Sequence, residues 1–260
     1  MTAKVKIDIV ETVAVVRLDS GTINPISFEL IGEMTDAVKK VRDDGGITGL
    51  VLASANDKFF SIGFDLPNII DIPDEEIRRF YRLFDRLCLD LYALPKPTIS
   101  AITGHAIAGG CILALCTDQR IIADGRRLMG LNEVDLGLPV PSTTLCILKD
   151  LVGARNARTI VKTGQLYGPE ECQRMGLVDT VAPVEAVLPK AMEAVKMLGA
   201  KPREAMAAMK RQRTAPVERE ARAMFEQNET DFLACWRSEE GRKRLRKALE
   251  AFKPHLKHSQ

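Results

Sequence analysis

Two adjacent glycines open a helix within a nearly uncharged segment, residues 98–124, that reads as strand, turn, helix and strand: TISAITGHAIAGGCILALCTDQRIIAD. A helix that begins at Gly109 and Gly110 presents free backbone N–H groups, and the positive end of its dipole, to whatever lies before it. Such donors can form an oxyanion hole, which stabilises negative charge as it develops on a carbonyl oxygen. The same pair also suits close packing of a helix against a strand. This segment alone leaves both interpretations open.

A carboxylate in apolar surroundings is the second candidate for chemistry. Glu133 lies in the segment LMGLNEV, where the loss of solvation would raise its pKa and make it a candidate general base. The alternative is a glutamate at a strand end that is paired with an arginine such as Arg120. A further glycine-containing turn, FFSIGFDL at residues 59–66, follows a predicted strand and would place another backbone N–H near the first.

Composition and motifs exclude several other classes of function. The sequence has neither a G-x-x-x-x-G-K-[ST] loop nor a G-x-G-x-x-G turn, so no nucleotide site is expected. Two of the three histidines lie near the C-terminus, which supports neither a histidine metal site nor a Ser-His-Asp triad, and no metal is expected. A formal net charge of +2 gives no electrostatic argument for a nucleic-acid or membrane partner.

Length and cysteine usage indicate a globular protein of the cytoplasm. With 260 residues and 46% hydrophobic content, the chain can form one large domain with an appendage. The six cysteines form no C-x-x-C pair and mostly lie among apolar residues, as reduced core cysteines do. The first residues carry charges within their apolar stretch, and no uncharged run approaches the length of a membrane span. We therefore expect neither export nor membrane insertion.

The elements that must position the candidate groups alternate along the first half of the chain. Hydrophobic periodicity predicts a hairpin of strands 5–9 and 13–18, helix 26–41, strand 49–54, helix 74–93 and strand 98–103. This order implies a mainly parallel sheet up to about residue 140. Beyond it we expect strand 177–181 and helices 142–152, 154–163, 169–175, 184–198 and 202–252. The apolar anchors of the charged tail, which we expect to need a partner surface, are Met224, Phe232, Leu233 and Trp236.

Taken together and in this order, these segments resemble the crotonase family, also called the enoyl-CoA hydratase/isomerase family. The similarity runs over nearly the whole chain and rests on FFSIGFDL, GHAIAGGC with the following Asp118, MGLNEVDLGLPV and PEECQRMGLVDTV. It implies an α/β fold with a spiral core of ββα units at residues 1–198 and a helical C-terminal region at 199–260 that mediates a homotrimer or hexamer. It also implies that the backbone N–H groups of Phe64 and Gly109 hold the thioester oxygen of an acyl-CoA.

Departures from the family pattern narrow the expected chemistry. Hydratases of the family carry a glutamate after the GGC motif, where this chain has Ile112, and dienoyl-CoA isomerases carry an aspartate where it has Pro141. Glu133 remains, so the chain resembles the Δ3,Δ2-enoyl-CoA isomerases, with Glu133 as the sole acid and base. The CoA arrives with the substrate, and no other cofactor is expected. The residues expected to contact the substrate are Ser61, Ile62, Gly63, Phe64, Asp65, Gly109 and Ile112, with Lys58 for the CoA phosphates.

Two other classes stay open at this stage. An enoyl-CoA hydratase, or another acyl-CoA enzyme of the family, would share the oxyanion hole but would need polar residues where Ile112 stands. A non-catalytic scaffold or RNA-binding member would need a basic face or a blocked pocket. The near-neutral net charge disfavours a basic face.

Overall fold

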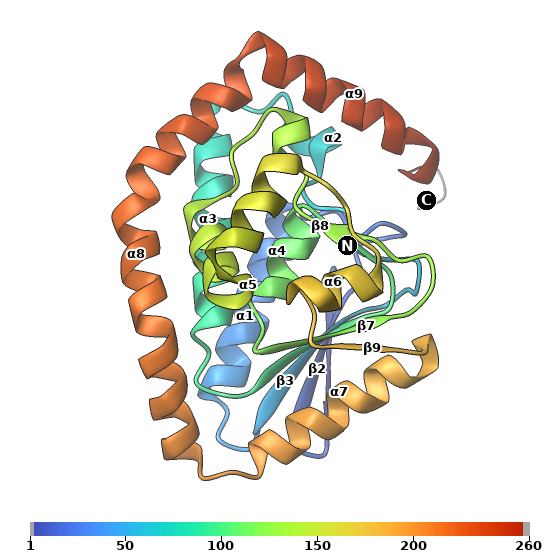
Figure 1. The fold of residues 1–260 in the computed structure, drawn as a ribbon, viewed down its shortest axis with the longest axis vertical. Helices are drawn as coiled ribbons and strands as arrows, with labels where there is room; N and C mark the ends of the chain where they lie inside the picture. The colour runs from blue at the N-terminus through green and yellow to red at the C-terminus, as the bar shows by residue number, and fades with distance from the viewer. Residues whose placement is uncertain (1–2, 257–260) are drawn as a thin grey trace.

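A six-stranded sheet forms the centre of the structure, a computed structural model that describes residues 3–256 (Figure 1). β1 pairs antiparallel with β2, and every later neighbour in the order β1-β2-β3-β5-β7-β9 is parallel. The predicted hairpin and mainly parallel sheet are therefore confirmed. The strands are β1 (Val5–Val10), β2 (Val13–Leu18), β3 (Gly49–Ser54), β5 (Thr98–Ile102), β7 (Gln119–Ala123) and β9 (Thr180–Ala182).

Apolar side chains on alternate positions of these strands build two separate cores. In β3, Val51 and Ala53 face α7 (Val184–Gly199), whereas Leu50 and Leu52 belong to the larger core on the other face. This follows from the period of two along a strand, which sends successive side chains to opposite faces. The larger core is covered mainly by α1 (Phe28–Asp43), α3 (Asp74–Tyr92) and α5 (Ser142–Thr163).

A second, three-stranded parallel sheet lies beside the first and positions the candidate groups. Its order is β4 (Phe59–Ser61), β6 (His105–Ile107) and β8 (Met129–Gly130). Each short strand follows a strand of the large sheet and leads into a helix, so the unit strand, short strand, helix occurs three times. These units confirm the predicted spiral core. The helices that follow are α2 (Leu66–Ile69), α4 (Gly109–Leu115) and the 3-10 helix η1 (Glu133–Leu136).

The later elements differ from their predicted bounds in small ways. The strand predicted at 177–181 is shorter, because β9 begins only at Thr180. The two helices predicted at 142–152 and 154–163 are confirmed, because α5 consists of two helices that meet at a kink at Gly153, where φ of 73° and ψ of 160° are not helical. Helix α6 (Pro169–Met175) has the predicted bounds. The six cysteines are all free, and five of them are buried.

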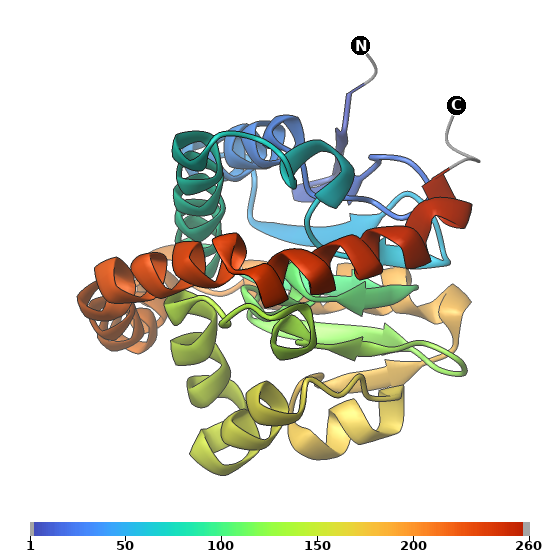
Figure 2. The same cartoon turned by 90° about the horizontal axis from the view of Figure 1, so that it is seen from above.

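The tail forms two helices that fold back on their own chain. α8 (Arg203–Arg237) runs along one side, and α9 (Glu239–Leu256) turns back across the top of the molecule (Figures 1 and 2). Phe232, Leu233 and Trp236 are buried there, and the Phe232 ring stacks on Tyr81 with a centroid distance of 4.4 Å. The expectation that these three anchors need a partner surface is therefore wrong. Only Met224 among the predicted anchors is exposed, by 40%.

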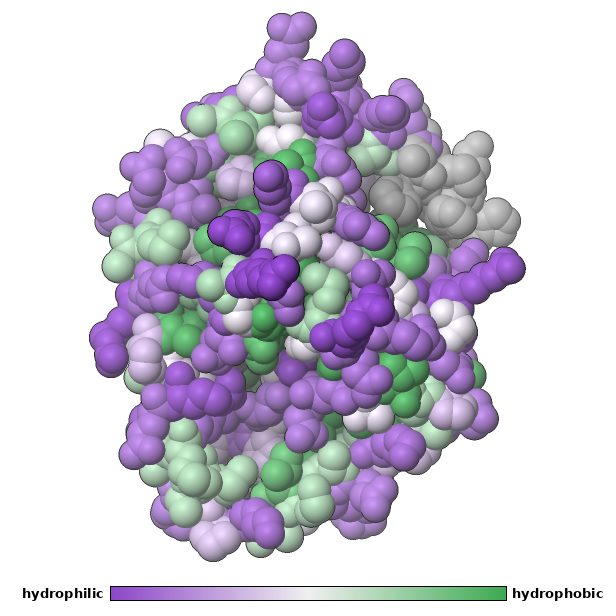
Figure 3. Space-filling model, viewed as in Figure 1, coloured by the Kyte–Doolittle hydropathy of each residue, from purple (hydrophilic) through white to green (hydrophobic). Residues whose placement is uncertain are grey.

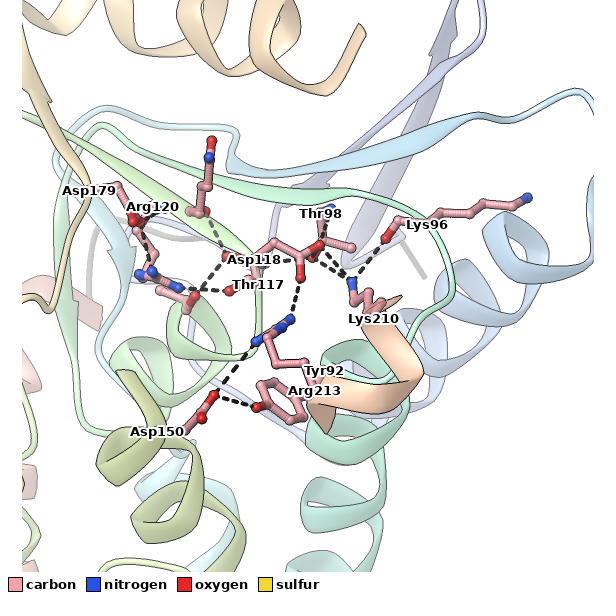
Figure 4. A network of polar contacts seen from close by, with 12 residues as sticks. Tyr92, Lys96, Thr98, Thr117, Asp118, Arg120, Asp150, Asp179, Lys210 and Arg213 are labelled. Carbon is pink, nitrogen blue, oxygen red and sulfur yellow. Dashed lines mark hydrogen bonds and ion pairs between the residues drawn. The ribbon is translucent and has the colours of Figure 1, made fainter. Parts of the chain in front are cut away.

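Charged contacts fix the first half of α8 to the large sheet (Figure 4). Asp118, which precedes β7, accepts a hydrogen bond from Lys210 at 2.7 Å and another from Arg213 at 2.6 Å. Arg213 also lies over the Tyr92 ring. The predicted boundary between residues 198 and 199 falls at the end of α7, and the division into a core and a C-terminal region stays a prediction.

Polar side chains cover most of the face in Figure 3, with the apolar ones in small separate groups. Within residues 3–256, the helices include none that is both long and apolar enough to span a bilayer.

Candidate active site

The three candidate groups lie at one edge of the small sheet. Phe64 follows β4, Gly109 follows β6 and Glu133 follows β8, and these strands are parallel neighbours. Since the carboxyl ends of parallel strands meet at the same edge of a sheet, residues far apart in the sequence are brought together there.

Glycines allow the loops after β4 and β6 to touch. A Cβ atom on Gly110 would lie 2.2 Å from the carbonyl oxygen of Ser61, and one on Gly63 would lie 3.0 Å from the backbone nitrogen of Gly109. The first distance is shorter than any real carbon–oxygen contact, so only glycine fits at residue 110. Of the two interpretations of the glycine pair, close packing therefore applies to Gly110. The same contact between the loops brings the backbone of Gly63 beside Gly109.

The hydrogen bonds on either side of Phe64 leave its own N–H free. Ile26 N–H donates to the Gly63 carbonyl at 2.9 Å, and Asp65 N–H donates to the Ile26 carbonyl at 3.0 Å. In a parallel bridge of this kind the intervening residue directs its backbone groups to the opposite side. No acceptor for the Phe64 N–H is found within residues 3–256. The Phe64 ring packs edge-on against Phe80 and Phe84 and fixes the residue.

Gly109 supplies the second free N–H. It is the first residue of α4, so its N–H has no partner within the helix. Ala108 before it has φ of 49° and donates its own N–H to the Gly130 carbonyl at 3.0 Å. A positive φ is strained for alanine, and the hydrogen bond to β8 holds it there. Within the described chain the Gly109 N–H has no acceptor.

Asn24 is a residue of this site that sequence analysis missed. Its backbone has φ of 44°, which asparagine tolerates, and its side chain donates to the Phe60 carbonyl at 3.1 Å and to Ser54 at 2.9 Å. The Ser61 hydroxyl donates to the Asn24 carbonyl at 2.7 Å and accepts from Gly63 N–H at 3.2 Å. Asn24 therefore holds the loop that carries Phe64. In the sequence it reads only as the residue before a proline.

A mostly apolar cavity of about 830 Å³, its mouth included, lies in front of the two N–H groups. Small-molecule sites share this apolar character, with a few polar groups among apolar side chains. Glu133 is the one carboxylate among the described residues that line it. The lining residues are Ile23, Pro25, Ile62, Phe64, Leu66, Pro67, Ile107, Ala108, Gly109, Ile112, Asn132, Glu133, Leu136, Leu138, Pro139, Pro141, Phe232, Leu245, Ala248 and Leu249.

Glu133 is 6% exposed, and its Oε2 atom has no hydrogen-bond partner among residues 3–250, whose side chains the structure describes. Burial raises its pKa to about 7, because the charged form loses its solvation. The alternative that Glu133 pairs with Arg120 is wrong. Arg120 instead donates to Asp179 at 2.7 Å (Figure 4). A carboxyl group with a pKa near neutrality can both accept and return a proton, as a general acid and base must.

The predicted substrate-contact residues divide into two groups. Ile62, Phe64, Gly109 and Ile112 line the cavity with Glu133. Ser61, Gly63 and Asp65 lie outside the lining, and desolvation raises the pKa of the buried Asp65.

Lys58 lies in a separate hollow with Asp57, His105, Arg126 and Arg127. Its contact with CoA phosphates stays a prediction. Asn132, which sequence analysis did not select, lines the cavity beside Glu133, and its Oδ1 atom is buried without a partner in the described chain.

The C-terminal helices close the cavity of their own chain. Phe232 of α8 and Leu245 of α9 belong to its lining. Arg242 holds α9 to the end of α2 through the Ile70 carbonyl, and Arg244 holds it to η1 through the Asp135 carbonyl at 3.2 Å. Figure 2 shows α9 crossing between these two parts of the molecule.

Fold and site together define an α/β protein of the crotonase class, in which two backbone donors and one carboxylate face an apolar cavity. The family model for enoyl-CoA hydratase/isomerase matches residues 8–259, and the chain belongs to this family of enzymes.

The relatives with known names include isomerases and hydratases. The chain is 33% identical over 207 residues to human mitochondrial enoyl-CoA delta isomerase 1, a match that covers 78% of this chain and 68% of the human protein. It is 35% identical over 190 residues to a putative enoyl-CoA hydratase of Thermus thermophilus, covering 72% of each. The crystal structure of human mitochondrial delta3-delta2-enoyl-CoA isomerase superposes with a TM-score of 0.91 at 29% identity, covering 96% of this chain and 98% of that one.

Proposed function

We propose that this protein is a Δ3,Δ2-enoyl-CoA isomerase, which moves the double bond of a 3-enoyl-CoA to the 2-trans position. The observation that carries the proposal is that one buried carboxylate, with its pKa raised to about 7, lines an apolar cavity with two free backbone N–H groups. The similarity to the human isomerase supports it.

In this reaction Glu133 removes a proton from C2 of the substrate. The electron pair of that C–H bond delocalises onto the thioester oxygen, which accepts hydrogen bonds from the N–H groups of Phe64 and Gly109. The resulting dienolate takes the same proton back from Glu133 at C4, and the double bond now joins C2 and C3. One carboxyl group suffices, because the proton never leaves the site.

Apolar residues favour isomerisation over hydration. Ile112 lies one helical turn after Gly109 and lines the cavity, as does Pro141. Neither side chain can hydrogen-bond a water molecule for attack on the substrate. The second candidate function, an enoyl-CoA hydratase, is favoured by the similarity to the Thermus protein, but it lacks a second carboxylate among the described lining residues.

The proposal extends to cofactors, assembly and location. The reaction requires no metal or redox cofactor, since the CoA belongs to the substrate. We also propose a homotrimer or hexamer, because the family resemblance implies one and Met224 on α8 stays exposed. A stable monomer in sedimentation experiments would contradict this. The cytoplasmic location expected from the cysteines stays a prediction.

Turnover of a 3-enoyl-CoA by the wild type and by Glu133→Gln tests the function. We expect the variant to bind acyl-CoA and to lose at least about a hundredfold in kcat, the scale for loss of a general acid and base. Asp135→Asn is the matched control, because Asp135 lies two residues away on the same short helix but is exposed. Near-normal turnover by folded Glu133→Gln would overturn the role of Glu133.

A further inference from the structure

Asn228 on α8 contacts the segment that links Glu133 to the next helix. This linker, residues 137–141, runs from the end of η1 to the start of α5, and Leu138, Pro139 and Pro141 line the cavity. The Asn228 side chain accepts a hydrogen bond from Ser142 N–H at 2.9 Å and donates one to the Val140 carbonyl at 3.3 Å. It therefore holds the two peptide groups on either side of Pro141.

The linker cannot supply these bonds itself. Pro139 and Pro141 have no N–H, and Ser142 is the first residue of α5, whose N–H has no partner within the helix. An amide side chain can accept a hydrogen bond from the Ser142 N–H and donate one to the Val140 carbonyl at the same time. At residue 228 a carboxylate could not donate to the carbonyl, and an alkyl group could form neither bond. The buried Tyr81 hydroxyl also donates to Asn228 and orients it.

The linker is tied at its other end to Glu133 itself. Leu138 N–H donates to the Glu133 carbonyl at 2.9 Å. The same stretch of α8 carries Phe232, which lines the cavity and stacks on Tyr81. A continuous chain of contacts thus runs from α8 through the linker to the backbone of Glu133.

We propose that Asn228 is a positioning residue of the isomerase, which fixes the linker so that the wall beside Glu133 stays closed and its carboxyl group stays oriented toward the substrate. The inference rests on the proposed function for its kinetic consequence. Its structural consequence, the environment of the Glu133 carboxyl, does not depend on which reaction is catalysed.

The test compares Asn228→Ala and Asn228→Leu with the wild type. Alanine removes the bonds without steric conflict, and leucine removes them while filling the volume. Gln227→Leu is the matched control, because Gln227 is exposed on the same helix and its side chain donates a hydrogen bond to Asp231, away from the linker. Two quantities are measured: kcat for a 3-enoyl-CoA, and the pKa of Glu133 from carbon-13 NMR of carboxyl-labelled glutamate, assigned by the signal lost in Glu133→Gln.

We expect both Asn228 variants to lose at least about tenfold in kcat, since small misplacements of reacting groups have large effects. The pKa of Glu133 should fall from about 7 toward its ordinary value as water reaches the carboxyl group. Gln227→Leu should change neither quantity.

Unchanged kcat and unchanged Glu133 pKa in the folded variants, with only a lower stability, would overturn the inference and leave Asn228 as a helix cap. If the wild type shows no isomerase turnover while the variants still shift the Glu133 pKa, the proposed function fails and the positioning role stands.

Discussion

Replacing Glu133 by glutamine should stabilise the protein at alkaline pH while it removes activity. Burial raises the pKa of Glu133 from 4.5 to about 7, so the folded state binds this proton more tightly than the unfolded state does. The stabilisation by the protonated carboxyl is therefore complete below about pH 4.5 and is lost as the pH rises through about 7. At about 1.4 kcal/mol per pH unit, the loss reaches roughly 3 kcal/mol near pH 8. Glutamine stays neutral at every pH, so the variant does not lose this stability as the pH rises.

Urea unfolding of both proteins near pH 5 and near pH 8 measures this effect. The unfolding free energy of Glu133→Gln, relative to the wild type, should rise by about 2 to 3 kcal/mol between the two conditions. Comparing two pH values cancels the pH-independent effects of the substitution, such as new hydrogen bonds of the amide. The exposed Asp135→Asn should show little such rise. An equal difference at both pH values would refute the reasoning, because the Glu133 pKa would then be ordinary.

Two further substitutions test the packing and the buried charge. Gly110→Ala should lower the free energy of unfolding in urea by about 1 to 3 kcal/mol or more, because its Cβ would lie 2.2 Å from the Ser61 carbonyl oxygen. Gly32→Ala is the control: this residue of α1 has open space around it, and the substitution should raise the free energy of unfolding by about 0.5 to 1 kcal/mol. Equal effects of the two substitutions would contradict the contact between the loops. Asp85→Asn should raise the free energy of unfolding near pH 8 but hardly near pH 4. Burial raises the pKa of Asp85 from 3.8 to about 6, so the stabilisation by its protonated form is lost as the pH rises through about 6. A gain in stability that does not depend on pH would contradict the raised pKa of Asp85.

Long elements of the fold could be predicted from the sequence, and the short ones could not. The strands of the large sheet other than the three-residue β9, together with α1, α3 and α7, have clear apolar patterns over five or more residues. β4, β6 and β8 have only two or three residues each, too few for a period to show. The spiral core was therefore expected only through the family resemblance, although these short strands bring Phe64, Gly109 and Glu133 together.

The sequence predicts the residues that would act on the substrate, but not the residues that hold them in place by hydrogen bonds. The glycine pair and Glu133 are local signals, since each depends on its immediate neighbours in the sequence. Asn24 and Asn228 act through hydrogen bonds to backbone groups more than 30 residues away. Such contacts have no characteristic spacing in the sequence, so they cannot be recognised there. A partner surface is expected for the anchors on the tail because the tail is too charged to form a core of its own. Phe232 packs instead on Tyr81 of the same chain, and an apolar helix face looks the same in sequence in both cases.

The most direct test of the central claim is the ratio of two activities of the wild-type protein, isomerisation of a 3-enoyl-CoA and hydration of crotonyl-CoA. With Ile112 and Pro141 in the cavity wall and Glu133 as its carboxylate, we predict that isomerisation is faster by at least about a hundredfold, the scale that one acid–base group contributes. Hydration at a rate comparable to isomerisation would contradict the account, because the cavity would then activate water without a second carboxylate.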